Sequence, residues 1–281
     1  MEVRAHSQGV IGVLVSVCLL ALALGGCGSG GETASVNEAS YRTYLLHNST
    51  LLVAALQSML REIRDGEVAR AESRYARARV RYSQIEPAAE EFAQLNRKID
   101  GLEQEVPSST FGGFHRIEKS LWLEETTAGM TPVAEHLVDD VKRLQAKFKT
   151  AHFSAPGLVD GMSRLLTEIS NAKLKGKEEP YSNTTLVDVS ANVEAVIAAA
   201  DALRVDPTLD AALHSRLKQA YAEMTHWGNP ASDPEQTRGR SPGAIFVWFE
   251  DLSPSDIAKI KQRIEAVEEP VSKLQSQLGQ S

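Results

Sequence analysis

The sequence from residue 113 to residue 122 is Gly113-Phe114-His115-Arg116-Ile117-Glu118-Lys119-Ser120-Leu121-Trp122. Its large apolar residues recur at the spacing expected of a helix with one buried side. His115 and Glu118 are three residues apart, so on a helix they share a face beside that apolar stripe. A buried imidazole–carboxylate pair must be hydrogen-bonded, charge-paired or metal-bound, because leaving it unpaired costs several kcal/mol. The stretch therefore predicts a helix with a candidate chemical site, although a plain surface contact is the simpler interpretation of this motif alone.

Helical periodicity recurs along the rest of the chain from Tyr41 onward. Ala, Leu, Glu, Arg and Lys dominate, and no stretch alternates between apolar and polar residues as a strand would. We therefore expect an all-α fold, an antiparallel helical bundle of about seven or eight helices. The expected helices span residues 37–65, 67 to about 94, a short segment at His115, 131 to about 153, 155–174, 182–204, 206–227 and 253 to about 278.

Pro87 lies inside the second of these expected helices, directly after Glu86. Because proline has no backbone N–H, it should kink the helix or end it and leave the carbonyl of Ser83 without its helical partner. A kink at this point could turn the Glu86 carboxylate inward. A simple helix break is equally compatible with the sequence.

The N-terminus has the pattern of an export signal. Arg4 precedes an apolar run at residues 10–24, which ends in Leu24-Gly25-Gly26-Cys27. This run is too short for a good membrane-spanning helix. Cysteine after Leu-Gly-Gly is the lipobox pattern of bacterial lipoproteins, so we expect cleavage before Cys27 and acylation of its thiol. An ordinary cleaved signal, with Cys27 as a bystander, is the alternative.

The expected organisation follows from this pattern. Residues 1–26 form a signal peptide, residues 27–40 a flexible Gly/Ser/Thr-rich tether, and residues 41–281 a helical domain. Cys18 would be removed with the signal, and lipidation would block Cys27. Disulfides and Cys-ligated zinc are therefore not expected in the mature protein.

The composition and the motifs exclude several classes of function. A formal net charge of −7 argues against a nucleic-acid-binding protein. The sequence contains no His-Glu-x-x-His zinc-protease motif, no Gly-x-Ser-x-Gly nucleophile motif and no P-loop. The Arg-rich run from residue 70 to residue 81 is interpreted as a solvated helical face.

Several segments, taken in order, resemble the EfeO/EfeM family of bacterial iron-uptake proteins, which carry an imelysin-like domain. The resemblance runs from about Tyr41 to the C-terminus. The stretch Arg79 to Pro87 and the stretch Gly113 to Trp122 are specific to the family only in combination. The other segments are Ile99-Asp100, Asp140 to Leu144, Glu178 to Ser182 and Ala191 to Glu194.

The resemblance implies a metal site made of histidine and carboxylate ligands. The residues that match the family's metal positions are His115, Glu118, Glu86 and Asp100. Weaker candidates, expected to line the cavity, are Glu178, Tyr181 and Glu194. Many relatives have Tyr-Ser-His-x-Asp where this chain has Asn183 and Thr185 in place of the His and Asp, which puts a secondary metal site in doubt.

The function implied by the resemblance is iron binding, without enzymatic activity. Such a protein would be exported and held by its lipid anchor at the outer face of the cytoplasmic membrane or in the periplasm. It would capture ferrous or ferric iron and deliver it to a membrane permease, with a haem peroxidase as a further partner. The same donor atoms can also bind zinc or copper.

The family's domain has two four-helix-type halves, with the seam here expected near residues 176–180. The chain is expected to lack the N-terminal copper-protein-like domain of the longer family form.

Two other classes of function remain open from the sequence. A metallopeptidase could use the His-x-x-Glu motif to hold a metal-bound water, with a neighbouring carboxylate as base. An envelope lipoprotein that binds a polysaccharide or a protein partner could carry the acidic residues incidentally.

Overall fold

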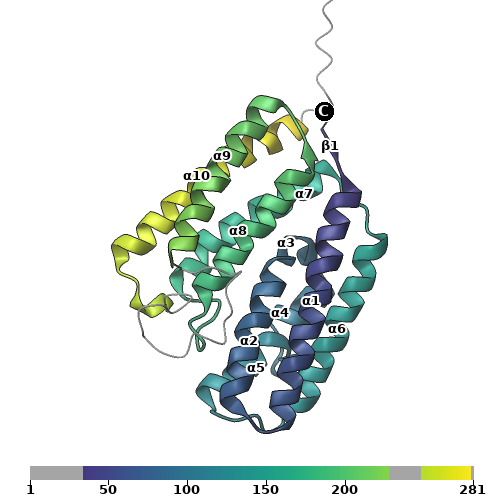
Figure 1. Cartoon of the computed structure of the whole chain (residues 1–281), viewed down its shortest axis with the longest axis vertical. Helices are drawn as coiled ribbons and strands as arrows, with labels where there is room; N and C mark the ends of the chain where they lie inside the picture. The colour runs from purple at the N-terminus through teal and green to yellow at the C-terminus, as the bar shows by residue number, and fades with distance from the viewer. Residues whose placement is uncertain (1–33, 228–247, 280–281) are drawn as a thin grey trace, which may run out of the picture. The chain divides into compact units, whose positions relative to one another are not determined.

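Helices make up almost all of the structure (Figure 1). The computed structural model describes residues 34–227 and 248–279, which all belong to one unit, Glu32–Ser281. The α-helices are α1 (Glu38–Arg64), α2 (Val68–Ser83), α3 (Glu86–Ala89), α4 (Ala93–Asp100), α5 (Gly113–Glu118), α6 (Met130–Thr150), α7 (Ala155–Asn171), α8 (Thr185–Ala202), α9 (Pro207–Trp227) and α10 (Pro254–Leu278). Short 3₁₀ turns are η1 (Glu90–Phe92), η2 (Ser108–Thr110), η4 (Lys173–Lys175) and η6 (Phe249–Asp251), and η3 (Lys119–Leu123) is a turn of π-helix. The prediction of an all-α bundle is confirmed.

The helices begin where the sequence provides capping residues. Asn37 accepts a hydrogen bond from the backbone N–H of Ser40 at the start of α1, at 3.2 Å. Ser253 and Asp256 form a reciprocal capping box at the start of α10. Between these ends most of the apolar faces meet in one large core, in which each fully buried Leu or Ile side chain stabilises the fold by about 1.5–3 kcal/mol.

The long helices pack in two groups. Helix α1 packs against α2 and α6, whereas α10 packs against α7 and α9, and α8 packs against α9. Helices α2 and α8 join the two groups. Because α7 already belongs with α10, the chain passes from one group to the other at residues 151–154, earlier than the expected seam near residues 176–180.

A short strand pair, not expected from the sequence, joins the start of the described chain to the end of α8. β1 (Ser35–Val36) pairs antiparallel with β2 (Leu203–Arg204). Residues 35–36 and the first turn of α1 thus fall within the segment expected to be a tether. The expected signal peptide at residues 1–26 and the expected lipidation site Cys27 lie outside the described residues. Among the described helices, none is long and apolar enough to cross a membrane.

The break expected at Pro87 is present, and the single helix expected from residue 67 to about 94 is wrong. α2 ends at Ser83, and a new helix, α3, begins at Glu86. The amide Nδ2 of Asn192, on α8, donates to the freed carbonyl of Ser83 at 3.0 Å and to Glu86 Oε2 at 2.7 Å. The break therefore both turns Glu86 inward and gives its carboxylate a partner from another helix.

Gly113 allows α5 to begin in close contact with the end of α4. Its φ is +62°, and a Cβ built there would lie 2.2 Å from the carbonyl oxygen of Ile99 and 2.5 Å from that of Lys98. Neither backbone oxygen can move without disturbing α4. This close approach brings His115 next to Asp100, the last residue of α4.

We expect Gly113→Ala to lower the free energy of unfolding by about 1–3 kcal/mol, because alanine is strained at this φ and overlaps the backbone of α4. Chemical denaturation followed by circular dichroism measures this change. The neighbouring Gly112→Ala is the matched control, because Gly112 has a φ of −149° and its nearest atom would be 3.8 Å from the added Cβ. Equal stabilities of the two variants would contradict this interpretation of Gly113.

Candidate metal centre

His115 is buried on α5, and one side of its ring is held by Glu118. The exposed fraction of His115 is 2%, and its Nδ1 lies 3.1 Å from Glu118 Oε2. Glu118 Oε1 accepts hydrogen bonds from the backbone N–H groups of Tyr181 and Ser182 and from the Ser182 hydroxyl, at 2.9–3.1 Å. Both oxygens of Glu118 are therefore engaged, and the carboxylate fixes the orientation of the imidazole.

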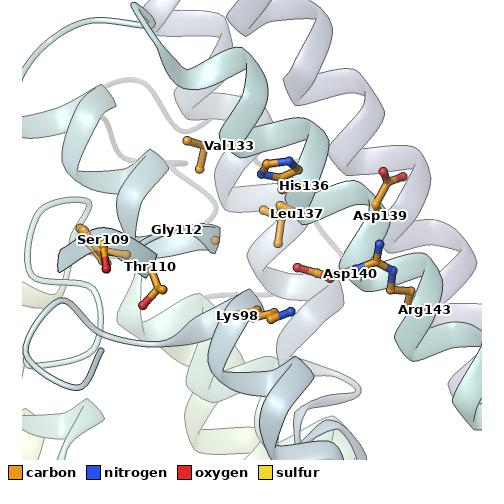
Figure 2. A pocket seen from close by; sticks show the side chains of 12 residues that line it. Lys98, Ser109, Thr110, Gly112, Val133, His136, Leu137, Asp139, Asp140 and Arg143 are labelled. Atoms are coloured by element: carbon orange, nitrogen blue, oxygen red, sulfur yellow. Dashed lines mark hydrogen bonds and ion pairs between the residues drawn. The ribbon is translucent and has the colours of Figure 1, made fainter. Parts of the chain in front are cut away.

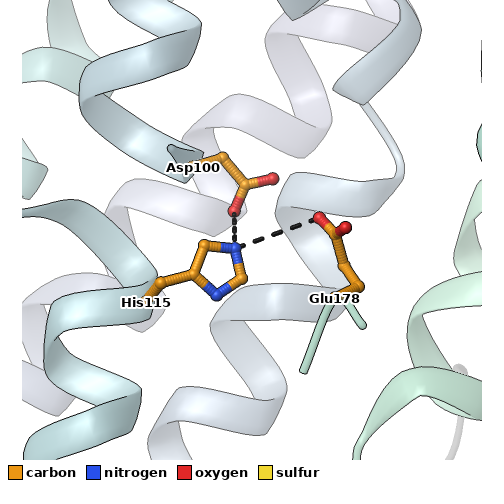
Figure 3. A group of neighbouring side chains, drawn as sticks. All are labelled: Asp100, His115 and Glu178. Atoms are coloured by element: carbon orange, nitrogen blue, oxygen red, sulfur yellow. Dashed lines mark ion pairs between the residues drawn. The ribbon is translucent and has the colours of Figure 1, made fainter. Parts of the chain in front are cut away.

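The other ring nitrogen of His115 faces two carboxylates (Figure 3). Its Nε2 lies 3.3 Å from Asp100 Oδ1 and 3.9 Å from Glu178 Oε1. This nitrogen is buried and has no hydrogen bond of normal geometry in the structure. We call Asp100, His115 and Glu178 the His115 group; their three possible ligand atoms lie within 4.8 Å of one another. One imidazole nitrogen and two carboxylate oxygens at this spacing form a donor set that suits a transition-metal ion.

The charges around this group shift the pKa values of two of its members. Burial opposes ionisation of Asp100, but the Arg79 guanidinium and the close contact with His115 outweigh it and lower the pKa of Asp100 to about 2. Burial also disfavours the imidazolium, yet the contacts with Asp100 and Glu118 raise the pKa of His115 to about 9. In the absence of a metal ion, His115 is thus protonated at neutral pH.

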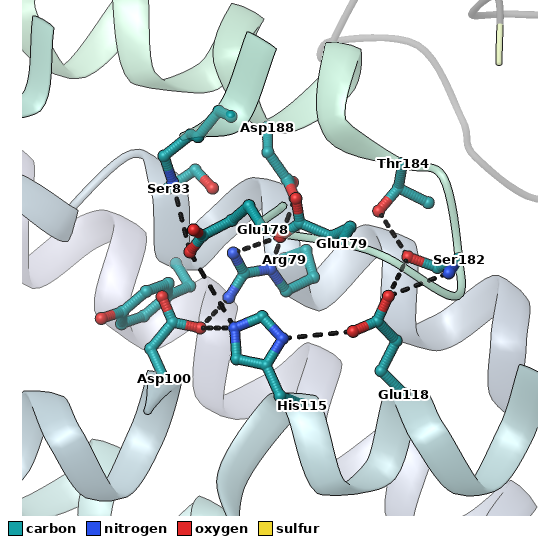
Figure 4. A network of polar contacts seen from close by, with 12 residues as sticks. Arg79, Ser83, Asp100, His115, Glu118, Glu178, Glu179, Ser182, Thr184 and Asp188 are labelled. Atoms are coloured by element: carbon teal, nitrogen blue, oxygen red, sulfur yellow. Dashed lines mark hydrogen bonds and ion pairs between the residues drawn. The ribbon is translucent and has the colours of Figure 1, made fainter. Parts of the chain in front are cut away.

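Arg79 is fully buried at the centre of the polar network (Figure 4). Its guanidinium pairs with Asp100, with Glu179 Oε1 at 2.5 Å and with Asp188 Oδ2 at 3.4 Å. The guanidinium carbon also lies 5.0–5.4 Å from two aromatic ring centroids, those of Phe114 and Tyr82. The interpretation of the Arg-rich run as a solvated face is therefore wrong for Arg79.

The sequence carried a signal for the burial of Arg79. Ala71 and Tyr75 precede it at four-residue spacing, and Tyr82 follows three residues later, so Arg79 continues the apolar stripe of α2. Asp188 has a similar signal, because it interrupts an apolar run on α8, a helix that is buried almost all round.

Burial and the neighbouring Asp188 raise the pKa of Glu179 well above its usual range.

Glu86 lies in a neighbouring group and not beside His115 Nε2. The ammonium of Lys173 donates to Glu86 Oε1 at 2.9 Å, and Asn192 donates to Glu86 Oε2. Lys173 is fully buried, and its role was not anticipated from the sequence.

The weaker candidates occupy different positions. Glu178 belongs to the His115 group, whereas Tyr181 contacts Glu118 through its backbone N–H. Glu194 lies outside that group and accepts hydrogen bonds from Gln84 and Tyr221, at 2.7 and 3.0 Å. Asn183 has a φ of +55°, and the buried hydroxyl of Thr185 has no hydrogen-bond partner.

A surface pocket lies near the start of α5, apart from the His115 group (Figure 2). It has a volume of about 440 Å³ and is bordered by η2, the first residues of α5 and one face of α6. Its charged lining residues are Lys98, Asp139, Asp140 and Arg143, and Asp140 pairs with Arg143 at 2.9 Å. None of the residues that line this pocket belongs to the His115 group.

Comparisons with known proteins agree with the resemblance found in the sequence. The chain matches the imelysin family model over residues 38–238. It is similar to the iron uptake system component EfeO of Escherichia coli (strain K12), Shigella flexneri and Shigella sonnei (strain Ss046), with 32% identity to each over 244 residues. The matched region covers 85% of this chain and 63% of each relative, so the chain spans less than two thirds of their length. From the extent of the family match, this chain belongs to the imelysin family.

Proposed function

We propose that this protein is an iron-binding component of an iron uptake system. It binds ferrous or ferric iron through His115 Nε2, Asp100 and Glu178, and Glu118 holds the imidazole in place. The name of the relatives, iron uptake system component EfeO, supports the choice of iron as the cargo. Zinc and copper are competing ions, because the same donors accept them.

One observation carries this proposal: the buried polar network contains more acidic side chains than cationic ones, even when His115 is counted with the cations. Its permanent cations in the described residues are Arg79 and Lys173. Its buried acidic side chains are Glu86, Asp100, Glu118, Glu178, Glu179 and Asp188. Uncompensated buried charge is costly, and a divalent or trivalent ion beside His115 Nε2 would reduce the excess.

The arrangement also supports reversible capture. Carboxylate oxygens bind iron strongly but release it when they are protonated or displaced. Glu118 acts as a positioning residue, because the carboxylate–imidazole contact orients the ring and increases the basicity of its free nitrogen. We propose that the released iron passes to a membrane permease, with a haem peroxidase as a further partner.

The proposed location is outside the cytoplasm. The signal-peptide and lipobox patterns that end at Cys27 support export and attachment of the mature chain to the membrane by a lipid anchor. We infer no enzymatic activity. In the peptidase mechanism considered above, both motif residues would hold the metal ion, whereas both oxygens of Glu118 are engaged by His115 and by the segment at residues 181–182.

Metal titration of the purified chain tests the proposed site. We expect about one iron ion per chain, a loss of affinity of at least about 100-fold in His115→Ala, and a loss of about 10–100-fold in Glu118→Gln, which removes the charge that supports the imidazole. Isothermal titration calorimetry with ferrous iron under anaerobic conditions, ferric iron and zinc measures these constants. Glu194→Gln is the control, since Glu194 is an acid of the same helical core outside the His115 group. Unchanged affinity in His115→Ala would rule out this site.

Metal binding should compete with protons. Burial lowers the pKa of His115, but its contacts with Asp100 and Glu118 outweigh burial and raise the pKa to about 9, so an ion that binds at neutral pH must displace one proton from the ring. The apparent affinity for zinc should therefore increase by up to about tenfold per pH unit from roughly pH 6 to 8. Calorimetry in two buffers with different protonation enthalpies counts the released proton. Binding without proton release would contradict the assignment of His115 as a ligand.

A further inference from the structure

A second group of carboxylates adjoins the His115 group. Glu86 on α3, Glu168 on α7 and Glu178 before α8 place carboxylate oxygens within 4.8 Å of one another. Glu86 and Glu178 are buried, at 3% and 5% exposed, whereas the side chain of Glu168 is 30% exposed. Glu178 belongs to both groups, and the two clusters therefore form one continuous carboxylate region.

The ammonium of Lys173 occupies this second group. Its Nζ lies 2.9 Å from Glu86 Oε1 and 3.7 Å from both Glu168 Oε1 and Glu178 Oε1. The Lys173 side chain is fully buried on η4, directly after α7. A cation of the protein itself is thus surrounded by three carboxylates, an environment that would otherwise suit a metal ion.

One oxygen atom connects the two positions. Glu178 Oε1 lies 3.9 Å from His115 Nε2 and 3.7 Å from Lys173 Nζ. In two-metal centres, one ligand can lie between the two ions and serve both. Glu178 has such a place here, between the donors at His115 and the ammonium of Lys173.

We propose that Lys173 is a specificity-determining residue that fills the second cation position and limits the centre to one metal ion per chain. The inference rests on the proposed function for the ion at His115. It also explains the position of Glu86: Lys173 and Asn192 engage its two oxygens, so this carboxylate is withheld from the first ion. An ammonium carries one charge and cannot exchange, and the second position therefore stays closed to metals.

Counting bound metal ions in Lys173→Met tests the inference. Methionine has a similar length without charge, so the three carboxylates regain an empty cation position. We expect one zinc or ferrous ion per chain in the wild type and two in Lys173→Met, measured by calorimetry and by elemental analysis of the dialysed full chain. Lys175→Met is the matched control, because it removes the same charge from an exposed position of the same turn and should leave one ion per chain.

The outcomes separate the two proposals. One ion per chain in Lys173→Met, or two in the wild type, would overturn the role of Lys173 while leaving the His115 site intact. No ion in the wild type would contradict the proposed function. If metal-free Lys173→Met does not fold, circular dichroism during zinc titration gives the answer. Folding that is complete only at two ions per chain supports the inference, and folding with fewer ions, or none at any zinc concentration, overturns it.

Discussion

The rest of the polar interior depends on the ion pairs that the buried guanidinium of Arg79 makes with three carboxylates. This guanidinium reaches Asp100 at the end of α4, Glu179 before α8 and Asp188 within α8, and so ties together segments that are distant in the sequence. The five N–H donors of a guanidinium lie in a fixed planar fork, which suits several carboxylates at once. Without this cation, the buried acids around it would lose their common partner, and an uncompensated buried charge costs several kcal/mol.

Arg79 also determines what the neighbouring imidazole can do. By keeping Asp100 ionised, it places a permanent negative charge 3.3 Å from His115 Nε2. Glu118 then fixes the ring from the opposite side, with its own oxygens held by the segment at residues 181–182. The His-x-x-Glu motif is therefore an orienting pair in this structure, and the oxygens that face the free nitrogen come from Asp100 and Glu178.

The sequence predicted the fold class well because helix periodicity and capping are local properties. The break at Pro87 could also be predicted, since a proline in a helix interior removes a backbone hydrogen bond whatever the rest of the fold does. It was harder to predict which residues come together around His115. Glu178 reaches His115, and Lys173 reaches Glu178, from the segment between α7 and α8, and no local pattern encodes these long-range contacts. Arg79 follows the apolar stripe of α2, but charge alone did not distinguish it from its solvated neighbours.

The most direct test is an anomalous diffraction experiment on crystals of the protein loaded with iron. Data collected on both sides of the iron absorption edge locate the ion independently of any assumed ligand. The proposed function predicts a single peak within coordination distance of His115 Nε2, Asp100 and Glu178, with Lys173 still among its own carboxylates. A peak elsewhere in the molecule, or one coordinated by Glu118 in place of Glu178, would contradict it.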